Sequence, residues 1–389
     1  MTRQIQFLTT CRADFSLLRP IMAAVDASDR LARDLVVTGM HLGRKFGHTV
    51  DEIEQSGFTP FREIDLGMDE VDTDTPSGQV ACMANLITGL SKLLSSSPPD
   101  IAVLLGDRFE MHAAALAYIS HKIPIAHIHG GEVTEGAVDD VYRHSLTKMS
   151  HIHFAAASEF ADRIRQMGEE NWRIYVTGAP GLDNIVKSRL PSKQDMSRRY
   201  GADFDSPYLL ITLHPETVTN DAPGEVISNL LQVLDGLDIA CIFTLPNADQ
   251  GGGIIRKAIE RFVCDHERAS MVESFGNPYY LAAMAYASAM VGNSSSGVIE
   301  APTLGVPVVN IGSRQDGRPM AQNIISCAIG CDDIAKAITR AVSADFKSHF
   351  QGVTNPYGDG NAAARMVEIL EGIELGEEFL KKKWRLQVQ

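Results

Sequence analysis

The chain has 389 residues, which is too long for one ordinary hydrophobic core. Its side chains are 44% hydrophobic and 22% charged, an ordinary composition for a globular protein. Its net charge of −14 argues against a nucleic-acid surface, and no apolar run reaches the roughly 18 residues of a membrane span. We therefore expect two domains of about 150 to 200 residues in a soluble, cytoplasmic protein.

Short apolar runs alternate with longer amphipathic segments in the first half of the chain. Strands are predicted at residues 5–9, 35–38, 101–105, 123–128, 152–155 and 173–176, with helices between them. This alternation is typical of β-α-β units, so an α/β fold with a parallel sheet is predicted. The polar stretch 187–205 interrupts it, and we place the domain boundary there.

The second half of the chain repeats the alternation. Strands are predicted at residues 208–213, 239–245, 271–272, 289–291 and 306–311, and the segment 362–384 has a helical period. The predicted domains are an N-terminal domain of residues 1–185 and a C-terminal domain of residues 186–365. Residues 366–389 are expected to form a helix that packs back across both.

The stretch 106–154 combines hydrophobic strands with a high density of titratable groups. Asp107 and Arg108 directly follow one apolar strand, and His129 and Glu132 follow the next. Because the carboxyl ends of parallel strands meet at one edge of a sheet, acid, base and cation should come together there. This edge is the predicted catalytic floor, since clustered titratable groups are typical of active sites.

Several other polar residues of this stretch are better explained structurally. His144, His151 and His153 match no zinc spacing and are expected to pack or to form hydrogen bonds. Glu110 is expected to be solvated or structural, and Asp140 is equally well explained as a helix cap. The six cysteines show no CxxC spacing, so reduced thiols are expected rather than disulfides or a zinc site.

A second group of polar residues follows strand ends in the C-terminal half. Residues 291–297, Val-Gly-Asn-Ser-Ser-Ser-Gly, join a strand to a helix, where unpaired N–H groups and the helix dipole favour a phosphate. Glu300 can accept two ribose hydroxyls, Arg314 and Arg318 can pair with phosphate oxygens, and His214 follows a third strand end on the same side. A Ser-rich helix cap is the plainer alternative. With neither a P-loop nor GxGxxG present, the group predicts a nucleotide diphosphate rather than ATP or NAD.

Eight motifs, in the same order, resemble the hydrolysing UDP-N-acetylglucosamine 2-epimerases of sialic-acid and legionaminic-acid pathways. They are Cys11-Arg-Ala-Asp-Phe-Ser16, Gly106-Asp-Arg-Phe-Glu110, His127-Ile-His-Gly-Gly-Glu132, Arg143-His-Ser-Leu-Thr-Lys148, Leu213-His-Pro-Glu216, Pro246-Asn-Ala-Asp249, Gly292-Asn-Ser-Ser-Ser-Gly297 and Asn310-Ile-Gly-Ser-Arg-Gln315. The resemblance covers most of the chain. It implies GT-B architecture: two Rossmann-like, doubly wound parallel-sheet domains with a cleft between them.

The resemblance also implies roles for individual residues. UDP binding is assigned to Arg12, Ser16, Arg108, His214, Asn247, Ser294, Ser295, Glu300 and Arg314. Asp107 and Asp139 match acid/base positions. His129 and Glu132 both remain candidates for a further acid/base residue, because vertebrate-type members carry Glu where this chain has His129. Arg143 is left open between a site residue and an ion-pair partner. The resemblance implies a homodimer or a dimer of dimers.

The implied reaction is elimination followed by hydration. A base removes the C2 proton as UDP leaves, and water then adds to the 2-acetamidoglucal while a proton returns to the other face of C2. Neither a metal nor another cofactor is required. UDP-GlcNAc, giving N-acetylmannosamine, is the first expectation, and UDP-N,N'-diacetylbacillosamine is the alternative. A GT-B protein that only bound nucleotide sugars would not need Asp107 and Asp139.

Overall fold

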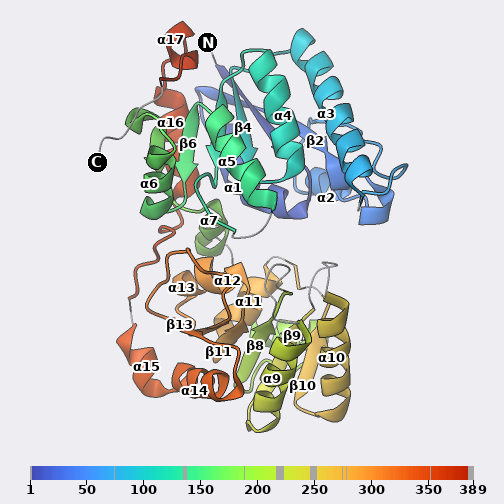
Figure 1. Cartoon of the computed structure of the whole chain (residues 1–389), viewed down its shortest axis with the longest axis vertical. Coiled ribbons are helices and arrows are strands. Elements are labelled where there is room, and N and C mark those ends of the chain that lie inside the picture. The colour runs from blue at the N-terminus through green and yellow to red at the C-terminus, as the bar shows by residue number, and fades with distance from the viewer. Residues whose placement is uncertain are drawn as a thin grey trace. The chain divides into compact units, whose positions relative to one another are not determined.

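The computed structural model describes residues 2–73, 75–134, 138–187, 189–215, 223–245, 252–273, 275–276, 278–350 and 352–383. The chain forms two compact units, each built on one parallel sheet with helices on both faces (Figure 1). The first unit comprises Met1–Val133, Ala137–Asn184 and Tyr357–Gln389, and the second comprises Thr134–Gly136 and Ile185–Pro356. The predicted α/β fold with parallel sheets is confirmed.

The first unit contains a seven-stranded sheet in the order β3-β2-β1-β4-β5-β6-β7. Its strands are β1 (Arg3–Thr9), β2 (Leu31–Thr38), β3 (Arg62–Ile64), β4 (Ile101–Leu105), β5 (Ile125–Ile128), β6 (Ile152–Ala155) and β7 (Ile174–Val176). The chain builds outward in one direction from β1 and in the other from β4. The switch point therefore lies between β1 and β4, where open parallel sheets bind ligands beyond the strand ends.

The helices of the first unit cover both faces of this sheet. They are α1 (Arg12–Asp26), α2 (Val50–Gln55), α3 (Pro76–Ser96), α4 (Phe109–Ser120), α5 (Val138–Met149), α6 (Ser158–Gln166), α7 (Pro180–Lys187), α16 (Ala362–Gly372) and α17 (Glu377–Leu380), with short 3-10 turns η1 (Gly39–His41), η2 (Arg44–Phe46) and η3 (Asn171–Arg173). Two separate apolar cores result. One packs α1 and α16 against the sheet, and the other packs α3 and α4 against it.

The second unit repeats the arrangement with a six-stranded sheet in the order β10-β9-β8-β11-β12-β13. Its strands are β8 (Tyr208–Thr212), β9 (Ala240–Thr244), β10 (Ala269–Val272), β11 (Ala289–Gly292), β12 (Val308–Ile311) and β13 (Ile324–Cys327). Its helices are α8 (Lys193–Tyr200), α9 (Pro223–Asp235), α10 (Gly252–Asp265), α11 (Tyr279–Tyr286), α12 (Ser295–Ile299), α13 (Ala301–Leu304), α14 (Cys331–Val342) and α15 (Ala344–His349). In the described residues, every helix is too short or too polar to cross a bilayer.

Strand β4 shows why the apolar runs form central strands. Its five residues are all buried, with Val103 and Leu105 in one core and Ala102 and Leu104 in the other. A strand covered on both faces reads as a continuous apolar run, which is how it was predicted. Strands β3 and β13 were not predicted. Both lie at sheet edges and are partly exposed, so they lack that apolar signal.

The C-terminal segment joins the first unit through a buried carboxylate. The side chain of Asp183 accepts hydrogen bonds from the backbone N–H groups of Ala362 (2.9 Å) and Ala363 (3.2 Å), the first residues of α16. Residues 357–365 belong to the first unit. The sequence analysis had instead placed them in the C-terminal domain, residues 186–365. The predicted helix of the tail is interrupted between Gly372 and Glu377.

Four histidines of the first unit, His41, His127, His151 and His153, are buried, and burial also lowers the pKa of His153. Burial is the main cause that lowers the pKa of His41 to about 4, of His127 to about 3 and of His151 to about 4. Each is therefore neutral in the folded protein at neutral pH. In the unfolded chain the same side chains bind a proton near pH 6.5.

These lowered pKa values predict acid sensitivity. Between pH 6.5 and about pH 4, these histidines bind protons in the unfolded chain but not in the folded chain. The free energy of unfolding is therefore highest above pH 6.5 and falls as the pH falls below that value. At pH 5 each buried histidine should lower the free energy of unfolding by about 2 kcal/mol relative to pH 7.5. Urea denaturation at the two pH values measures this loss, and equal free energies at both would contradict the prediction.

Candidate active site

The predicted residues of the first unit lie beyond neighbouring strand ends. Asp107 and Arg108 follow β4, and His129 follows β5, the adjacent strand. Asp139 lies in the first turn of α5, a helix that contacts both α4 and β5. One edge of the sheet thus carries two carboxylates, a guanidinium and an imidazole.

Asp107 is oriented by Arg143, a residue that the sequence analysis left open. The guanidinium Nη2 of Arg143 forms an ion pair with Oδ2 of Asp107, and its Nη1 lies 3.8 Å from Oδ1 of Asp140. The Arg143 side chain is only 5% exposed, whereas that of Asp107 is 27% exposed. Arg143 is therefore a buried support, and Asp107 is the member of the pair that solvent and a ligand can reach.

His129 and Glu132, predicted as alternatives, form one hydrogen-bonded pair. Nδ1 of His129 lies 2.6 Å from Oε1 of Glu132, and both side chains are largely buried. His129 has a left-handed backbone with φ of +64°, an uncommon conformation for a residue other than glycine. Gly131 follows with φ of +76°, and a Cβ there would lie 2.4 Å from the carbonyl oxygen of Phe160. This tight turn brings Glu132 back to the ring of His129.

Arg108 is held by Glu110, which is fully buried rather than solvated. Nε and Nη2 of Arg108 donate to the two carboxylate oxygens of Glu110 at 3.2 and 2.8 Å. Burial raises the pKa of Glu110, and Arg108 opposes that rise. Because the contact is bidentate, it fixes the plane of the guanidinium. Arg108 is thus positioned before any ligand arrives.

Arg12 and Ser16, both predicted to bind UDP, lie on α1 directly after β1. Arg12 is exposed and forms an ion pair with Glu52. The backbone carbonyl of Ser16 accepts a hydrogen bond from Nδ2 of Asn184 at 2.8 Å. Arg12 is therefore a surface cation near the switch point of the sheet.

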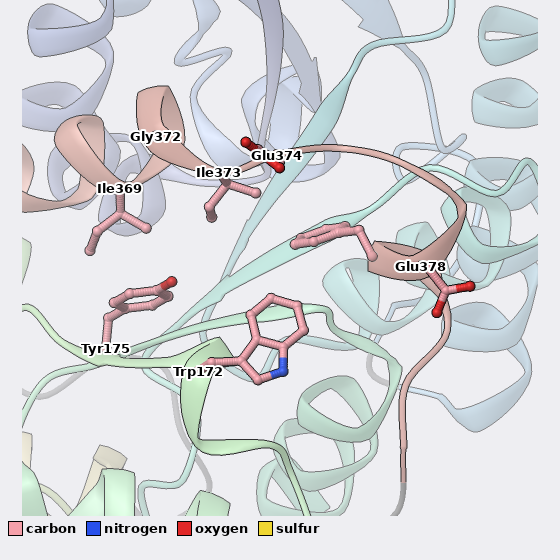
Figure 2. Close-up of a pocket in the computed structure, with 8 residues that line it drawn as sticks. Trp172, Tyr175, Ile369, Gly372, Ile373, Glu374 and Glu378 are labelled. Carbon is pink, nitrogen blue, oxygen red and sulfur yellow. The ribbon is translucent and has the colours of Figure 1, made fainter.

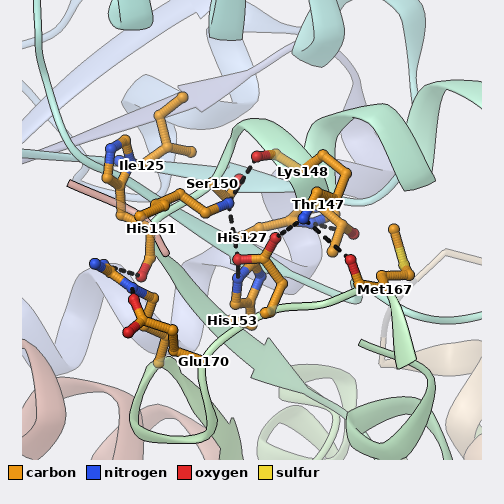
Figure 3. A network of polar contacts seen from close by, with 12 residues as sticks. Ile125, His127, Thr147, Lys148, Ser150, His151, His153, Met167 and Glu170 are labelled. Atoms are coloured by element: carbon orange, nitrogen blue, oxygen red, sulfur yellow. Dashed lines mark hydrogen bonds and ion pairs between the residues drawn. The ribbon is translucent and has the colours of Figure 1, made fainter. Parts of the chain in front are cut away.

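His127 forms hydrogen bonds on both sides of its ring, and Figure 3 labels it together with one of its partners, Thr147. Its Nε2 lies 2.8 Å from the carbonyl oxygen of Gly106, and its Nδ1 lies 3.3 Å from Oγ1 of Thr147 on α5. Gly106 immediately precedes Asp107. The neutral ring of His127 therefore links the loop after β4 to the helix that carries Arg143.

In the second unit, Asn293 joins the ends of three neighbouring strands. Its Oδ1 accepts from the backbone N–H of His214 at 2.7 Å, and its Nδ2 donates to the carbonyl of His214 at 2.9 Å. Its own carbonyl accepts from Nη1 of Arg314 at 3.2 Å and from Nε2 of Gln315 at 2.9 Å. His214 follows β8, and Arg314 follows β12. The sequence analysis assigned no role to Asn293 or Gln315.

Ser294 and Ser295 begin helix α12 immediately after Asn293. The Ser294 hydroxyl accepts from the backbone N–H of Ser296 at 3.3 Å, so Ser294 is the helix cap that the plainer interpretation expected. Glu300 follows at the C-terminal end of α12. Burial raises the pKa of Tyr280, whose phenol lies near the hydroxyls at this strand edge. Asn247, also predicted to bind UDP, lies outside the described residues.

The acidic and imidazole groups do not form a metal cluster in the part of the chain that the structure describes. No group of three or more His, Cys, Asp or Glu there is arranged to hold a metal ion. The arrangement offers proton-transfer groups in the first unit, and it offers hydrogen-bond donors with a guanidinium in the second.

Comparison with known proteins gives consistent matches along the chain. The family model for UDP-N-acetylglucosamine 2-epimerase matches residues 23–371. The chain is 34% identical over 386 residues to the UDP-N,N'-diacetylbacillosamine 2-epimerase (hydrolyzing) of Legionella pneumophila, covering 98% of this chain and 99% of the relative. It is also 34% identical over 344 residues to a UDP-N-acetylglucosamine 2-epimerase of Neisseria meningitidis serogroup B, covering 88% of each.

The fold matches solved structures as well. The crystal structure of a Neisseria meningitidis UDP-GlcNAc 2-epimerase bound to UDP-GlcNAc aligns with a TM-score of 0.79 and 18% identity, covering 95% of this chain and 99% of that one. At this level of identity, the likeness shows that the two chains share the two-domain, GT-B-like fold.

Gly292, the last residue of β11, predicts a large loss of stability from one added methyl group. Gly292 has φ of +141°, and a Cβ there would lie 1.9 Å from the carbonyl oxygen of Thr212. Gly292→Ala should therefore lower the stability of the second unit by more than about 3 kcal/mol, because strain and steric overlap add. Gly305, with φ of +66° and no neighbour within 4 Å, is the matched control. Gly305→Ala should cost about 1 kcal/mol, and equal losses in urea denaturation would contradict the argument.

Proposed function

The chain belongs to the UDP-N-acetylglucosamine 2-epimerase family, and on that premise we propose that it is a hydrolysing 2-epimerase. It converts a UDP-2-acetamido sugar and water into UDP and the free sugar inverted at C2. The observation that carries the proposal is the pairing at the edge of the first sheet. Asp107 is oriented by Arg143, and His129 is oriented by Glu132, so both proposed acid/base side chains are held in defined orientations.

The proposed chemistry needs protons to move on both faces of the sugar ring. One group removes the C2 proton as the bond from C1 to the UDP oxygen breaks, which gives the 2-acetamidoglucal. Water then adds at C1 while a second group returns a proton to the opposite face of C2. General acid/base groups on different sides of the ring can carry out these proton transfers. Asp107, the His129–Glu132 pair and Asp139 are the proposed groups.

The His129–Glu132 pair is proposed to act as one acid/base group. Glu132 contacts Nδ1 of the ring, so Nε2 is the nitrogen at which a proton is exchanged with substrate. A carboxylate at Nδ1 also stabilises the imidazolium that forms when the ring takes up a proton. In this chain, His129 is therefore the proton carrier, and Glu132 fixes its tautomer and orientation.

Nucleotide binding is proposed for residues at the strand ends of the second unit and, separately, for Arg12, Ser16 and Arg108 of the first unit. Asn293 anchors the backbone of His214 and the side chain of Arg314, so the exposed guanidinium of Arg314 stands close to the Ser294 turn. A guanidinium beside backbone N–H groups suits a diphosphate. The full proposed set is Arg12, Ser16, Arg108, His214, Asn247, Ser294, Ser295, Glu300 and Arg314.

Two UDP-sugars are candidates for the substrate. The Legionella relative is named for UDP-N,N'-diacetylbacillosamine and the Neisseria relative for UDP-N-acetylglucosamine, and both are 34% identical to this chain. Identity therefore does not choose between them, and UDP-GlcNAc stays the first proposal, with N-acetylmannosamine as product. We also propose that the enzyme works in the cytoplasm, without a cofactor, as a homodimer or a dimer of dimers.

Incubation with nucleotide sugar and no acceptor tests the proposed function. Purified protein should release UDP from UDP-GlcNAc or from UDP-N,N'-diacetylbacillosamine, with the C2-inverted free sugar as the other product. Coupled detection of UDP gives the rate, and NMR identifies the sugar. A protein that binds both substrates in calorimetry but releases UDP from neither is a binding protein, and the proposal fails.

The pairing of His129 with Glu132 predicts a non-additive double variant. His129→Ala should lower kcat by about two to four orders of magnitude, the usual contribution of a general acid or base. Glu132→Gln should lower kcat as well, because the ring loses its orienting carboxylate. The double variant should lose little beyond His129→Ala, since Glu132 acts through the ring. Independent, multiplying losses would show that each residue acts separately on the substrate.

A further inference from the structure

The C-terminal tail, residues 377–383, packs against the first unit at the opposite end of α5 from Asp139. Its Phe379 is buried and lies with its ring centroid 6.1 Å from that of His151 and 5.9 Å from that of Trp172. Trp172 and Tyr175 also line a cavity of about 450 Å³ beside this contact (Figure 2). Phe379 therefore gives the tail a buried apolar contact with the rest of the first unit.

The polar end of the tail reaches the end of α5. Nζ of Lys382 donates to the backbone carbonyl of Lys148 at 2.6 Å and lies 2.8 Å from Oε2 of Glu169. Lys148 is the penultimate residue of α5, so its carbonyl is one of the terminal groups without a partner inside the helix. An ammonium group at this position also complements the negative end of the helix dipole. Lys382, from a distant part of the chain, thus caps the C-terminal end of α5.

Glu169 ties this cap to the sheet. Its carboxylate accepts from Nζ of Lys148 at 2.5 Å and lies 3.1 Å from Nε2 of His153 in β6 (Figure 3). Although burial opposes it, the contact with His153 and the charges of Lys382 and Lys148 lower the pKa of Glu169 to about 2. The carboxylate is therefore ionised and holds both lysines. The buried carboxylate of Glu169 therefore contacts the tail, α5 and β6.

Two further contacts hold the backbone of the tail. Nη2 of Arg173 donates to the carbonyl of Lys381 at 3.3 Å, and the N–H of Lys383 donates to Oε2 of Glu170 at 3.3 Å. Arg173 also pairs with Glu170 at 2.9 Å. Lys382 is therefore held from both sides, with its side chain directed into the first unit.

Helix α5 connects this anchor to the candidate active site. The helix carries Asp139 in its first turn and Arg143, the partner of Asp107, one turn later. Asp139 and Lys148 are nine residues apart, roughly 14 Å along the helix axis. A shift at the anchored end therefore moves the helix that sets the position of Asp107.

We propose that Lys382 is a positioning residue, which anchors the C-terminal end of α5 and so keeps Asp139 and the Arg143–Asp107 pair in place for catalysis. The catalytic part of this inference rests on the proposed function, whereas the anchoring of α5 does not. Lys382 touches no group that we propose to meet the substrate. Its effect should therefore fall on turnover rather than on nucleotide binding.

The test compares Lys382→Met with two matched variants. Lys381→Met is the control, because the side chain of Lys381 is exposed and forms a local ion pair with Glu378, three residues before it. Lys382→Arg keeps the charge. Amide hydrogen exchange across α5 is measured without substrate, kcat and KM are measured with UDP-sugar, and UDP affinity is measured by calorimetry.

In Lys382→Met, exchange in the last turn of α5 should rise about tenfold and kcat should fall about tenfold, the scale of one charge at a partly buried helix end. UDP affinity should stay within about twofold of wild type, as expected when the nucleotide contacts are untouched. Lys381→Met should match wild type, and Lys382→Arg should restore most of kcat.

Three results would overturn the proposal. Unchanged exchange in α5 would show that Lys382 anchors nothing, and faster exchange throughout the first unit would show general destabilisation. A local rise in exchange with normal kcat would break the link to catalysis. If wild-type protein turns over no UDP-sugar, the proposed function fails, and the exchange comparison still decides whether Lys382 anchors α5.

Discussion

Parallel strand pairing is the constraint on which the candidate site depends. Because every strand of a parallel sheet runs the same way, all carboxyl ends open onto one edge, and residues distant in sequence meet there. In the first unit, this brings the segments after β1, β4 and β5 together. In the second unit, it brings together the segments after β8, β11 and β12. The helices that follow these strands then supply the supporting side chains.

The supports share one arrangement, in which a more deeply buried group fixes a more exposed group that we propose for the site. Arg143 fixes Asp107, Glu132 fixes His129, and Glu110 fixes Arg108. A buried charge is costly unless it is paired, so the charge of each buried partner is compensated by the group that it fixes. Catalysis by acid/base groups needs them held within a fraction of an ångström, which paired side chains on strands and helices provide.

Much of this organisation could be predicted from the sequence, and the reasons differ by feature. Strand β4 was predicted because a strand buried on both faces is continuously apolar, and Asp107 was placed at its end for the same reason. The edge strands β3 and β13 were missed because exposure removes that pattern. The Asp107–Arg143 pair joins residues 36 positions apart, and it depends on how α5 rotates against the sheet. No local pattern encodes that rotation.

The role of Asn293 shows a second kind of limit. Its place in a Gly-Asn-Ser turn after an apolar run signals a strand end, and the sequence analysis used that signal for Ser294 and Ser295 only. The hydrogen bonds from Asn293 reach His214, 79 residues away, because β8 and β11 are neighbours in the second sheet. Side chains that join strand ends can be found from sequence only once the strand order is known.

The central claim is that the C2 proton leaves and another returns to the opposite face. Reaction in heavy water tests it most directly, with NMR of the free sugar product. The account predicts deuterium at C2 and inverted configuration in every product molecule. A product that keeps its original hydrogen and configuration at C2 would contradict the account and indicate simple hydrolysis of the sugar–phosphate bond.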